Sequence, residues 1–351
     1  MNYARLILAA VILTGCSGRD HKDKPDPPRP KQAPPQKAVV IKKLILHPHP
    51  GQSPTATPFF IRANITFLQS QPFDGMSVYL RDGQSMLLGQ EIQKPVAVPI
   101  ETIRRVLAPM IGLSGKYFAT VFGSSPPSFF DDAGWAIVVE NWKRLAIVCK
   151  EVGLVGILFD NEQYASPWGN WISGGSNNLI DTQEKAIIRG TEVMTAVVAE
   201  YPAITVITLH GPSISRMDAL PPIFPQWQTS NELLGPFMEG FLAGSGGTAT
   251  IVDGGELYSL RSLAQFAEAN VYRSANWPAA SLGFGIYDKP FQGAAMNVSI
   301  LRPTLVNAIA EATEWCWYYP ELFTYLKSSA TGGAPADWVQ AIRNARTDAG
   351  M

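Results

Sequence analysis

Cysteine and histidine are both scarce in this chain, which limits the metal sites and disulfides that the sequence can build. Only 3 cysteines and 4 histidines occur among the 351 residues, and no cysteines have the short spacing of a zinc site. Cys149 and Cys316 lie within apolar segments, so we expect two small buried side chains rather than a disulfide. We predict that the protein needs no cofactor and no metal.

Charge is also sparse. Charged residues make up 16% of the chain and its formal net charge is −1, so the sequence lacks the basic surplus typical of nucleic-acid binding. The low charged fraction, beside 46% hydrophobic residues, indicates a folded chain with a large buried core rather than a solvated tail. The length suits a single α/β barrel, an architecture that runs to about 250 residues or more.

The N-terminal part of the sequence has no apolar run long enough to form a transmembrane helix. Leu6–Leu13 is apolar but short, and it follows a positively charged start, so residues 1–15 read as a signal peptide. The segment ends in Leu13-Thr14-Gly15-Cys16, which resembles the lipobox of bacterial lipoproteins. The resemblance implies cleavage before Cys16, its lipidation, and a membrane-anchored location in the bacterial cell envelope, in the periplasm or at the surface. An ordinary signal peptide is the alternative.

Residues 16–38 are poor in apolar side chains and rich in proline, which excludes a helix and favours an extended, disordered linker. The prolines of this segment are Pro25, Pro27, Pro28, Pro30, Pro34 and Pro35. We predict that the linker holds residues 39–351, the expected catalytic domain, away from the membrane.

Short apolar runs alternate with segments of helical period through the rest of the chain. The predicted strands are residues 39–46, 76–80, 117–122, 154–159, 204–209, 248–252, 282–286 and 315–319. The predicted helices are residues 57–69, 100–111, 135–151, 182–201, 231–243, 260–270, 302–314 and 336–346. Eight strand-helix units predict parallel strands closed into a (β/α)8 TIM barrel. A doubly wound open sheet is the alternative, although no glycine-rich phosphate motif follows the first strand.

Polar side chains gather where the predicted strands end, which is where barrel enzymes place their active sites. They are His47 and His49 after strand one, Asp160 and Glu162 after strand four, His210 after strand five, Asp253 and Glu256 after strand six, Tyr287 and Asp288 after strand seven, and Trp317, Tyr319 and Glu321 on strand eight. We therefore expect a polar site at the C-terminal mouth of the barrel.

The fourth strand carries the sharpest signal. Side chains alternate along a strand, so Leu158, Asp160 and Glu162 share one face. If Leu158 fills the barrel, both carboxylates point into its mouth, and the pKa of one is raised by the other. The alternative is that Asp160 caps a helix and Glu162 is solvated.

A raised carboxylic acid beside an ionised carboxylate is the pair that glycoside hydrolysis requires. We assign Glu162 as the general acid and base, Asp160 as its neighbouring stabiliser, and Glu256 as the leading nucleophile or base. Asp253 and Asp288 follow as candidates. The remaining polar and aromatic residues at the strand ends, His210, Tyr287, Trp317 and Glu321, are expected to orient hydroxyls and sugar rings.

Tryptophan and tyrosine after strand four point to a carbohydrate substrate. Tyr164, Trp168 and Trp171 follow the two acids, and Trp315 and Trp317 lie on strand eight. Aromatic faces stack on the apolar faces of sugar rings, although core packing explains any one of them equally well.

These residues resemble two groups of barrel proteins. Residues 156–164, GILFDNEQY, are similar to the end of the strand-four signature of family 18 chitinases, and the resemblance implies an orienting role for Asp160 and an acid role for Glu162. The earlier aspartates of that signature fall on Val155 and Leu158. Residues 72–75 (PFDG), 159–164 and 252–256 (VDGGE) also resemble a poorly characterised group of bacterial glycosyl hydrolases with TIM barrels.

Two other functions stay open. His47, His49 and His210 resemble part of the metal site of amidohydrolase barrels, which predicts a metal-dependent hydrolase. Aromatic residues and a lipid anchor would equally serve a non-catalytic carbohydrate-binding lipoprotein.

Overall fold

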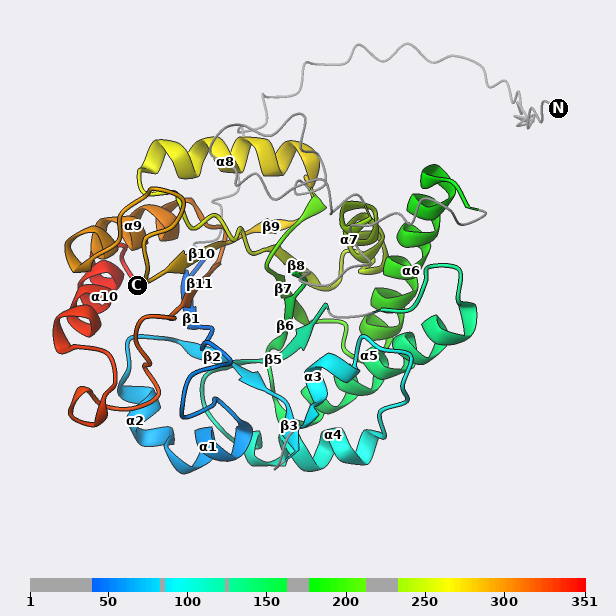
Figure 1. Cartoon of the computed structure of the whole chain (residues 1–351), viewed down its shortest axis with the longest axis horizontal. Helices are drawn as coiled ribbons and strands as arrows, with labels where there is room; N and C mark the ends of the chain where they lie inside the picture. Colours follow the sequence, from blue (N-terminus) through cyan, green and yellow to red (C-terminus); the bar gives the residue numbers. More distant parts are fainter. Residues whose placement is uncertain (1–39, 83–85, 124–125, 163–176, 213–232) are drawn as a thin grey trace, which may run out of the picture. The chain divides into compact units, whose positions relative to one another are not determined.

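A computed structural model describes residues 40–82, 86–123, 126–162, 177–212 and 233–351. Residues Val40–Met351 form one compact unit. In this unit a ring of parallel strands is surrounded by helices (Figure 1). Tyr164, Trp168 and Trp171, and Cys16 with the rest of the N-terminal segment, lie outside the described residues.

The ring contains the strands that the alternation predicts. In chain order they are β1 (Lys43–Leu46), β2 (Gly75–Tyr79), β5 (Lys116–Phe122), β6 (Gly156–Asp160), β7 (Thr205–Thr208), β8 (Thr250–Asp253), β9 (Ser281–Leu282), β10 (Phe284–Tyr287) and β11 (Trp315–Tyr319). Every pairing in the ring is parallel. A separate antiparallel pair, β3 (Arg81–Asp82) with β4 (Met86–Leu87), follows β2.

The ring closes through a seventh strand that is interrupted at one residue. β9 pairs with β8 and β10 pairs with β11, and Gly283 alone lies between them. The Gly283 N–H donates to the Asp253 carbonyl at 2.7 Å, so the interruption also contacts β8. The predicted (β/α)8 barrel is confirmed, and the alternative of an open, doubly wound sheet is wrong.

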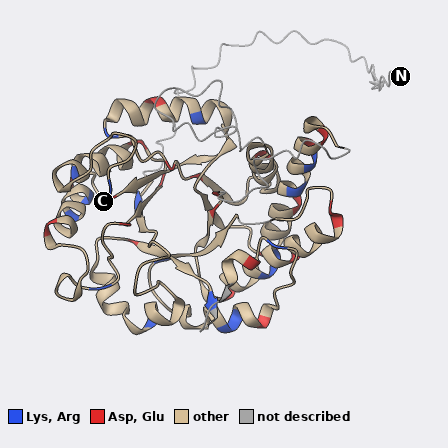
Figure 2. Ribbon diagram, in the orientation of Figure 1, with Lys and Arg blue, Asp and Glu red and all other residues tan. Residues whose placement is uncertain are grey.

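The described helices lie outside the ring. They are α1 (Pro58–Ala63), α2 (Ile65–Ser70), α3 (Leu88–Glu91), α4 (Ile100–Leu107), α5 (Asp132–Val152), α6 (Leu179–Glu200), α7 (Leu234–Gly244), α8 (Leu263–Asn276), α9 (Val298–Glu311) and α10 (Ala336–Asp348). Blue and red segments, which mark charged residues, lie mostly on this outer layer (Figure 2). None of the described helices is both long and apolar enough to cross a membrane.

One predicted helix is two helices. The pattern of residues 57–69 predicts a single helix, but α1 ends and α2 begins at Asn64. The Asn64 side-chain amide donates to the Phe60 carbonyl at 2.9 Å. Asparagine competes in this way with regular helical hydrogen bonding, and a periodicity argument does not register that competition.

Two apolar layers hold the barrel together. Between strands and helices, Trp142 packs edge-on against Phe159, with ring centroids 5.2 Å apart. Inside the ring, the strand register sets Leu158 beside Ile207 and Ile207 beside Val252, so their side chains form one interior layer. Residues two and four positions further along these strands therefore point to the C-terminal mouth.

Candidate active site

A cavity of about 260 Å³ opens at the C-terminal ends of the strands. Four acids, four aromatic residues, two histidines and one leucine line it: Asp160, Glu162, Glu256, Glu321, Tyr258, Tyr287, Phe291, Tyr319, His47, His49 and Leu209. Among the described residues in this lining, none is lysine or arginine. The cavity is thus a site rich in hydrogen-bond acceptors and aromatic faces.

The alternation along β6 places both acids of the fourth strand in this cavity. Leu158 is fully buried in the interior layer. Asp160 lies two residues further and Glu162 four residues further on the same face, and both line the cavity. Residues 163–176, where a helix capped by Asp160 would run, lie outside the described residues.

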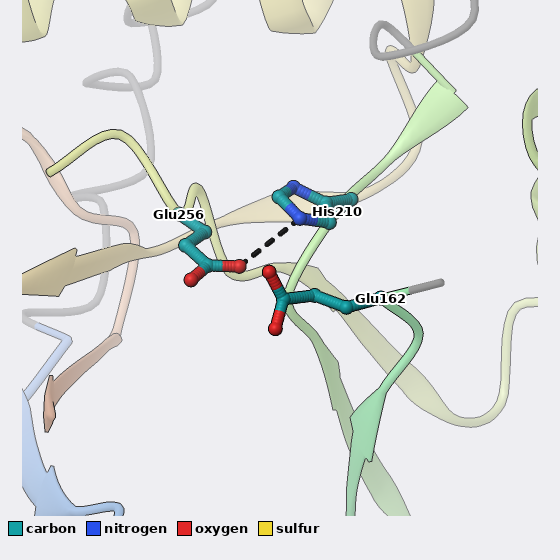
Figure 3. A group of neighbouring side chains, drawn as sticks. All are labelled: Glu162, His210 and Glu256. Atoms are coloured by element: carbon teal, nitrogen blue, oxygen red, sulfur yellow. Dashed lines mark ion pairs between the residues drawn. The ribbon is translucent and has the colours of Figure 1, made fainter. Parts of the chain in front are cut away.

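Glu162, His210 and Glu256 converge from the ends of three neighbouring strands (Figure 3). One donor atom from each of the three side chains lies within 4.8 Å of the other two. His210 Nε2 is 3.0 Å from Glu256 Oε2, the distance of an ion pair. The alignment is poor for a hydrogen bond, because Oε2 has no partner that meets the angular criteria. Distance governs their Coulomb attraction, so we treat the two groups as paired.

A tight turn after β8 brings Glu256 into the cavity. Gly255 has φ 57, a left-handed conformation that favours glycine. A Cβ atom at this position would lie 2.3 Å from Arg273 Nη1. The turn ends with the Glu256 N–H donating to the Leu209 carbonyl at 3.2 Å, which fixes Glu256 to the end of β7.

Asn161, which sequence reasoning missed, fixes the position of His210. Its side-chain amide donates to the His210 carbonyl at 2.8 Å, and its Oδ1 accepts the His210 N–H at 3.0 Å. Asn161 is fully buried. It points away from the cavity between the two acids, so only its place between Asp160 and Glu162 marks it in the sequence.

The acids and the imidazole perturb one another. The protein around Asp160, and then the charges of Glu162 and Glu256, raise its pKa well above the ordinary value. Burial of His210 opposes its charged form, but the contact with Glu256 and the charges of Glu162 and Asp253 outweigh burial and raise its pKa. The arrangement therefore favours the protonated form of Asp160 and the charged form of His210 more than water does.

Three tyrosines form an aromatic wall of the cavity: Tyr258, Tyr287 and Tyr319. The ring centroids of Tyr258 and Tyr287 are 4.7 Å apart, those of Tyr287 and Tyr319 are 5.9 Å apart, and no two ring planes differ by more than 24°. Burial of Tyr258, followed by the nearby charges of Glu256 and Glu162, raises its pKa. Sequence reasoning missed Tyr258, although its spacing of two residues from Glu256 was a usable signal.

Glu321 lies at the rim of the cavity and is held by two partners. Lys289 Nζ lies 2.6 Å from Glu321 Oε1, and the Tyr287 hydroxyl donates to Oε2. Burial opposes the charged form of Glu321, but these two partners keep its pKa below the ordinary value. Tyr287 and Glu321, both predicted site residues, therefore form one charged network at the edge of the cavity.

Asp253 and Asp288, also predicted site residues, do not line the cavity. Asp253 Oδ1 is 3.1 Å from Nη1 of Arg273, and both side chains are buried in the layer outside the ring. Asp288 accepts the N–H groups of Glu321, Leu322 and Phe323 at 2.9, 2.9 and 3.0 Å. Each aspartate follows an inward residue, Val252 or Tyr287, so alternation turns it outward. The structure gives both of them a structural role.

Trp317 lies beneath the cavity rather than in its wall. Its side chain is fully buried, its indole N–H donates to the Gly254 carbonyl at 2.8 Å, and its ring meets Tyr258 edge-on. A Cβ atom at Gly285 would lie 2.3 Å from Trp317 Cζ2, so the ring occupies the space that this glycine leaves. The prediction that Trp317 contacts a sugar is corrected: it supports the aromatic wall from below.

The three barrel histidines do not form the expected metal set. His47 is buried, and its Nδ1 is 2.7 Å from Ser77 Oγ. Burial, followed by the nearby His49, lowers the pKa of His47 to about 3. His210 instead groups with Glu162 and Glu256, and these three are the described residues whose donor atoms lie close enough to hold one ion.

No protein-family model matches the chain, and no curated protein matches its sequence. Among solved structures, a GH18 chitinase from Pseudoalteromonas aurantia is 13% identical, with 87% of this chain and 100% of that chain covered and a TM-score of 0.45. A GH5 xyloglucan-specific endo-beta-1,4-glucanase from a metagenomic library is 8% identical, with 81% and 87% covered and a TM-score of 0.48.

A third neighbour is 3-keto-D-glucoside 4-epimerase from E. coli, 13% identical over 87% of this chain and 99% of that chain, with a TM-score of 0.47. At these identities the likeness concerns the barrel fold alone, which serves many unrelated reactions. Any assignment of function therefore rests on the side chains in the cavity.

Proposed function

We propose that the protein is a glycoside hydrolase that acts on a polysaccharide or glycan. One observation carries the proposal: Glu162 and Glu256, from the ends of β6 and β8, meet in one cavity with donor atoms no more than 4.8 Å apart. Glycosidases place two carboxyl groups on either side of the scissile bond, about 5–5.5 Å apart in retaining enzymes and about 6.5–9.5 Å apart in inverting enzymes. The short separation favours retention.

The surroundings divide the roles between the two acids. Glu256 lies deeper in the barrel than Glu162 and has the imidazole of His210 3.0 Å away as its partner. Glu256 is therefore the nucleophile. Glu162 is the more exposed of the two and lies near Asp160 and Glu256. Negative neighbours favour a bound proton, which suits Glu162 to act as the general acid and then the general base.

The reaction follows in two balanced steps. A Glu256 oxygen bonds to the anomeric carbon while the bond to the leaving oxygen breaks, and Glu162 gives that oxygen its proton. Glu162 then takes a proton from water, the water oxygen bonds to the anomeric carbon, and the ester to Glu256 breaks. Asp160 would stabilise positive charge that develops on the sugar or donate a hydrogen bond to it.

A screen of polysaccharides and aryl glycosides, run with the wild type and with Glu162→Gln, tests this function. The wild type should hydrolyse at least one substrate, and the variant should bind it but lose turnover. Glu101→Gln on α4 is a matched control, because Glu101 is exposed and its contact is with Arg104. Binding without turnover by the wild type would indicate the carbohydrate-binding lipoprotein instead.

A metal-dependent hydrolase is the second candidate, favoured by the grouping of two carboxylates and one imidazole. Glu162, Glu256 and His210 offer oxygen and nitrogen donors of the kind that zinc accepts. A bound ion would require His210 to lose its proton, against the direction in which Glu256 raises its pKa. Metal analysis of the purified protein and activity after chelation separate the candidates, since the glycosidase keeps full activity without metal.

We also propose that residues 1–38 anchor the protein to the bacterial cell envelope through a lipid on Cys16. The lipobox-like end of the signal peptide and the proline-rich linker support the proposal. Metabolic labelling with a fatty acid tests it: label should enter the wild type and not Cys16→Ala. Label in both proteins, or in neither, would contradict it.

A further inference from the structure

Among the described residues, the acids that line the cavity outnumber the positive groups that face it. Asp160, Glu162, Glu256 and Glu321 are four carboxyl groups around a space of about 260 Å³. His210 supplies one positive charge beside Glu256. The other two histidines of the cavity, His47 and His49, have pKa values lowered first by burial. The cavity is therefore net negative even with a proton on one carboxyl group.

Two positive side chains near the cavity are already engaged, and a third, Arg81, lies near Tyr79 outside the described lining. Lys289 pairs with Glu321 at the rim, and its Nζ atom lies 2.6 Å from the carboxylate. Arg273 is buried outside the ring against Asp253. A substrate with a carboxylate, sulfate or phosphate would thus enter a negative space in which the described lining offers it no free cation. Like charges in such a space repel one another.

A second, independent observation concerns the wall of the cavity. Glu256 is 5% exposed, lines the cavity and is paired with His210. Beside it, the near-parallel rings of Tyr258 and Tyr287 offer faces that attract both the apolar side of a sugar and a cation.

We infer that the substrate is a glycan whose sugars carry free amino groups, so that an ammonium group enters the acidic cavity against the tyrosine wall. The inference rests on the proposed glycosidase function and names its substrate class. An ammonium group supplies three N–H donors and a positive charge, which match the acceptors and the net charge of the cavity. A neutral hydroxyl supplies a hydrogen-bond donor but no positive charge, and an anionic sugar is repelled.

The test uses the full-length protein and substrates that differ in one group. The set is aryl glucosides of both anomers with a free amino group, an acetamido group or a hydroxyl at C2, together with the glucuronide. We expect kcat/KM for the amino sugar to exceed that for each of the others by roughly tenfold or more, and the margin to shrink as salt is added.

Charge variants sharpen the result. Glu321→Gln removes one negative charge from the rim and leaves Lys289 without its partner, so the preference for the amino sugar should fall severalfold. Glu101→Gln makes the same change on exposed α4 and should leave the preference unaltered. An equal effect of both variants would overturn the inference, because the preference would then follow overall charge.

The outcomes separate the inference from the function beneath it. Hydrolysis that favours the neutral or anionic sugar overturns the inference and leaves the glycosidase in place. Tight, salt-sensitive binding of amino-sugar oligomers without hydrolysis supports the inference about the ligand and contradicts the proposed glycosidase activity. Loss of binding after chelation would instead assign the acidic cavity to a metal ion, and would overturn the inference.

Discussion

The carboxylates at the mouth of the barrel fall into two groups, which residue type alone does not distinguish. Asp253 and Asp288 are buried outside the ring, where Arg273 pairs with Asp253 Oδ1 and three backbone N–H groups donate to Asp288. Glu162 and Glu256 lie inside the ring, close together and facing open space. The difference shows that a carboxylate at a strand end is a candidate catalytic group only when the alternation of side chains along the strand points it into the barrel.

Asp253 and Glu256 show this within a single turn. Asp253 is the last residue of β8 and Glu256 lies three residues later, yet Asp253 pairs with Arg273 of α8 and Glu256 reaches the cavity. Gly254 and Gly255 between them permit the change of direction, since Gly255 adopts φ 57. The first group should therefore affect stability and the second group activity, and the following changes test that division.

The largest expected effect is on turnover. Glu162→Gln and Glu256→Gln should each lower kcat by about 10³-fold, because each removes a proton donor or a nucleophile and keeps the size of the side chain. The thermal midpoint of Glu162→Gln should stay the same or rise, since like charges in the cavity are relieved, whereas that of Glu256→Gln should fall, since His210 loses its buried partner. Kinetics on the substrate found by screening, with calorimetric melting of the same samples, measures both. Full turnover in either variant would place the chemistry elsewhere.

A large effect on stability is expected from Asp253→Ala. The change leaves Arg273 buried without its carboxylate partner, and breaking a buried ion pair costs about 3–5 kcal/mol. The free energy of unfolding, measured in denaturant, should fall by that amount. Glu314→Ala, which removes a partly exposed carboxylate from a pair with Lys43, is the control and should cost about 1 kcal/mol or less. Equal losses in the two variants would contradict the assignment of Asp253.

A smaller effect with a defined sign is expected from Asp160→Asn. The pKa of Asp160 is raised in the folded state, so its contribution to stability is complete below the unfolded pKa of 3.8 and is lost as pH rises through the folded pKa. The neutral amide avoids that loss. The variant should be more stable than the wild type at neutral pH, and the gain should vanish near about pH 3. A variant less stable than the wild type at neutral pH would refute the raised pKa.

Much of the fold could be predicted from sequence because apolar periodicity reports directly on burial. Every predicted strand of the barrel overlaps an observed strand, and the period of two on β6 placed Asp160 and Glu162 on the face of Leu158. Closure was less certain from sequence, because β9 and β10 are short and interrupted at Gly283. The Gly283 N–H donates to Asp253 of β8, and β10 pairs with β11 from Phe284 onward, so the ring is completed.

The site was only partly predictable, since side-chain partners come from distant segments. Asp253 looked like a site residue because its partner, Arg273, lies 20 residues away on a helix. Trp317 looked like a sugar-stacking residue because it is a tryptophan near a strand end. Its ring instead fills the space that Gly285 leaves in the core. Tyr258 follows the same turn as Glu256, and its role appears only when Tyr287 and Tyr319 are placed beside it.

The stereochemistry of the first product tests the central claim most directly. Proton NMR of the anomeric signal, recorded as the wild type hydrolyses its substrate, reports the configuration before mutarotation. Retention is predicted, because inversion needs a water molecule between the base and the anomeric carbon, and Glu162 and Glu256 are too close together to leave room for it. Inversion would contradict the pairing of these two carboxylates as acid and nucleophile.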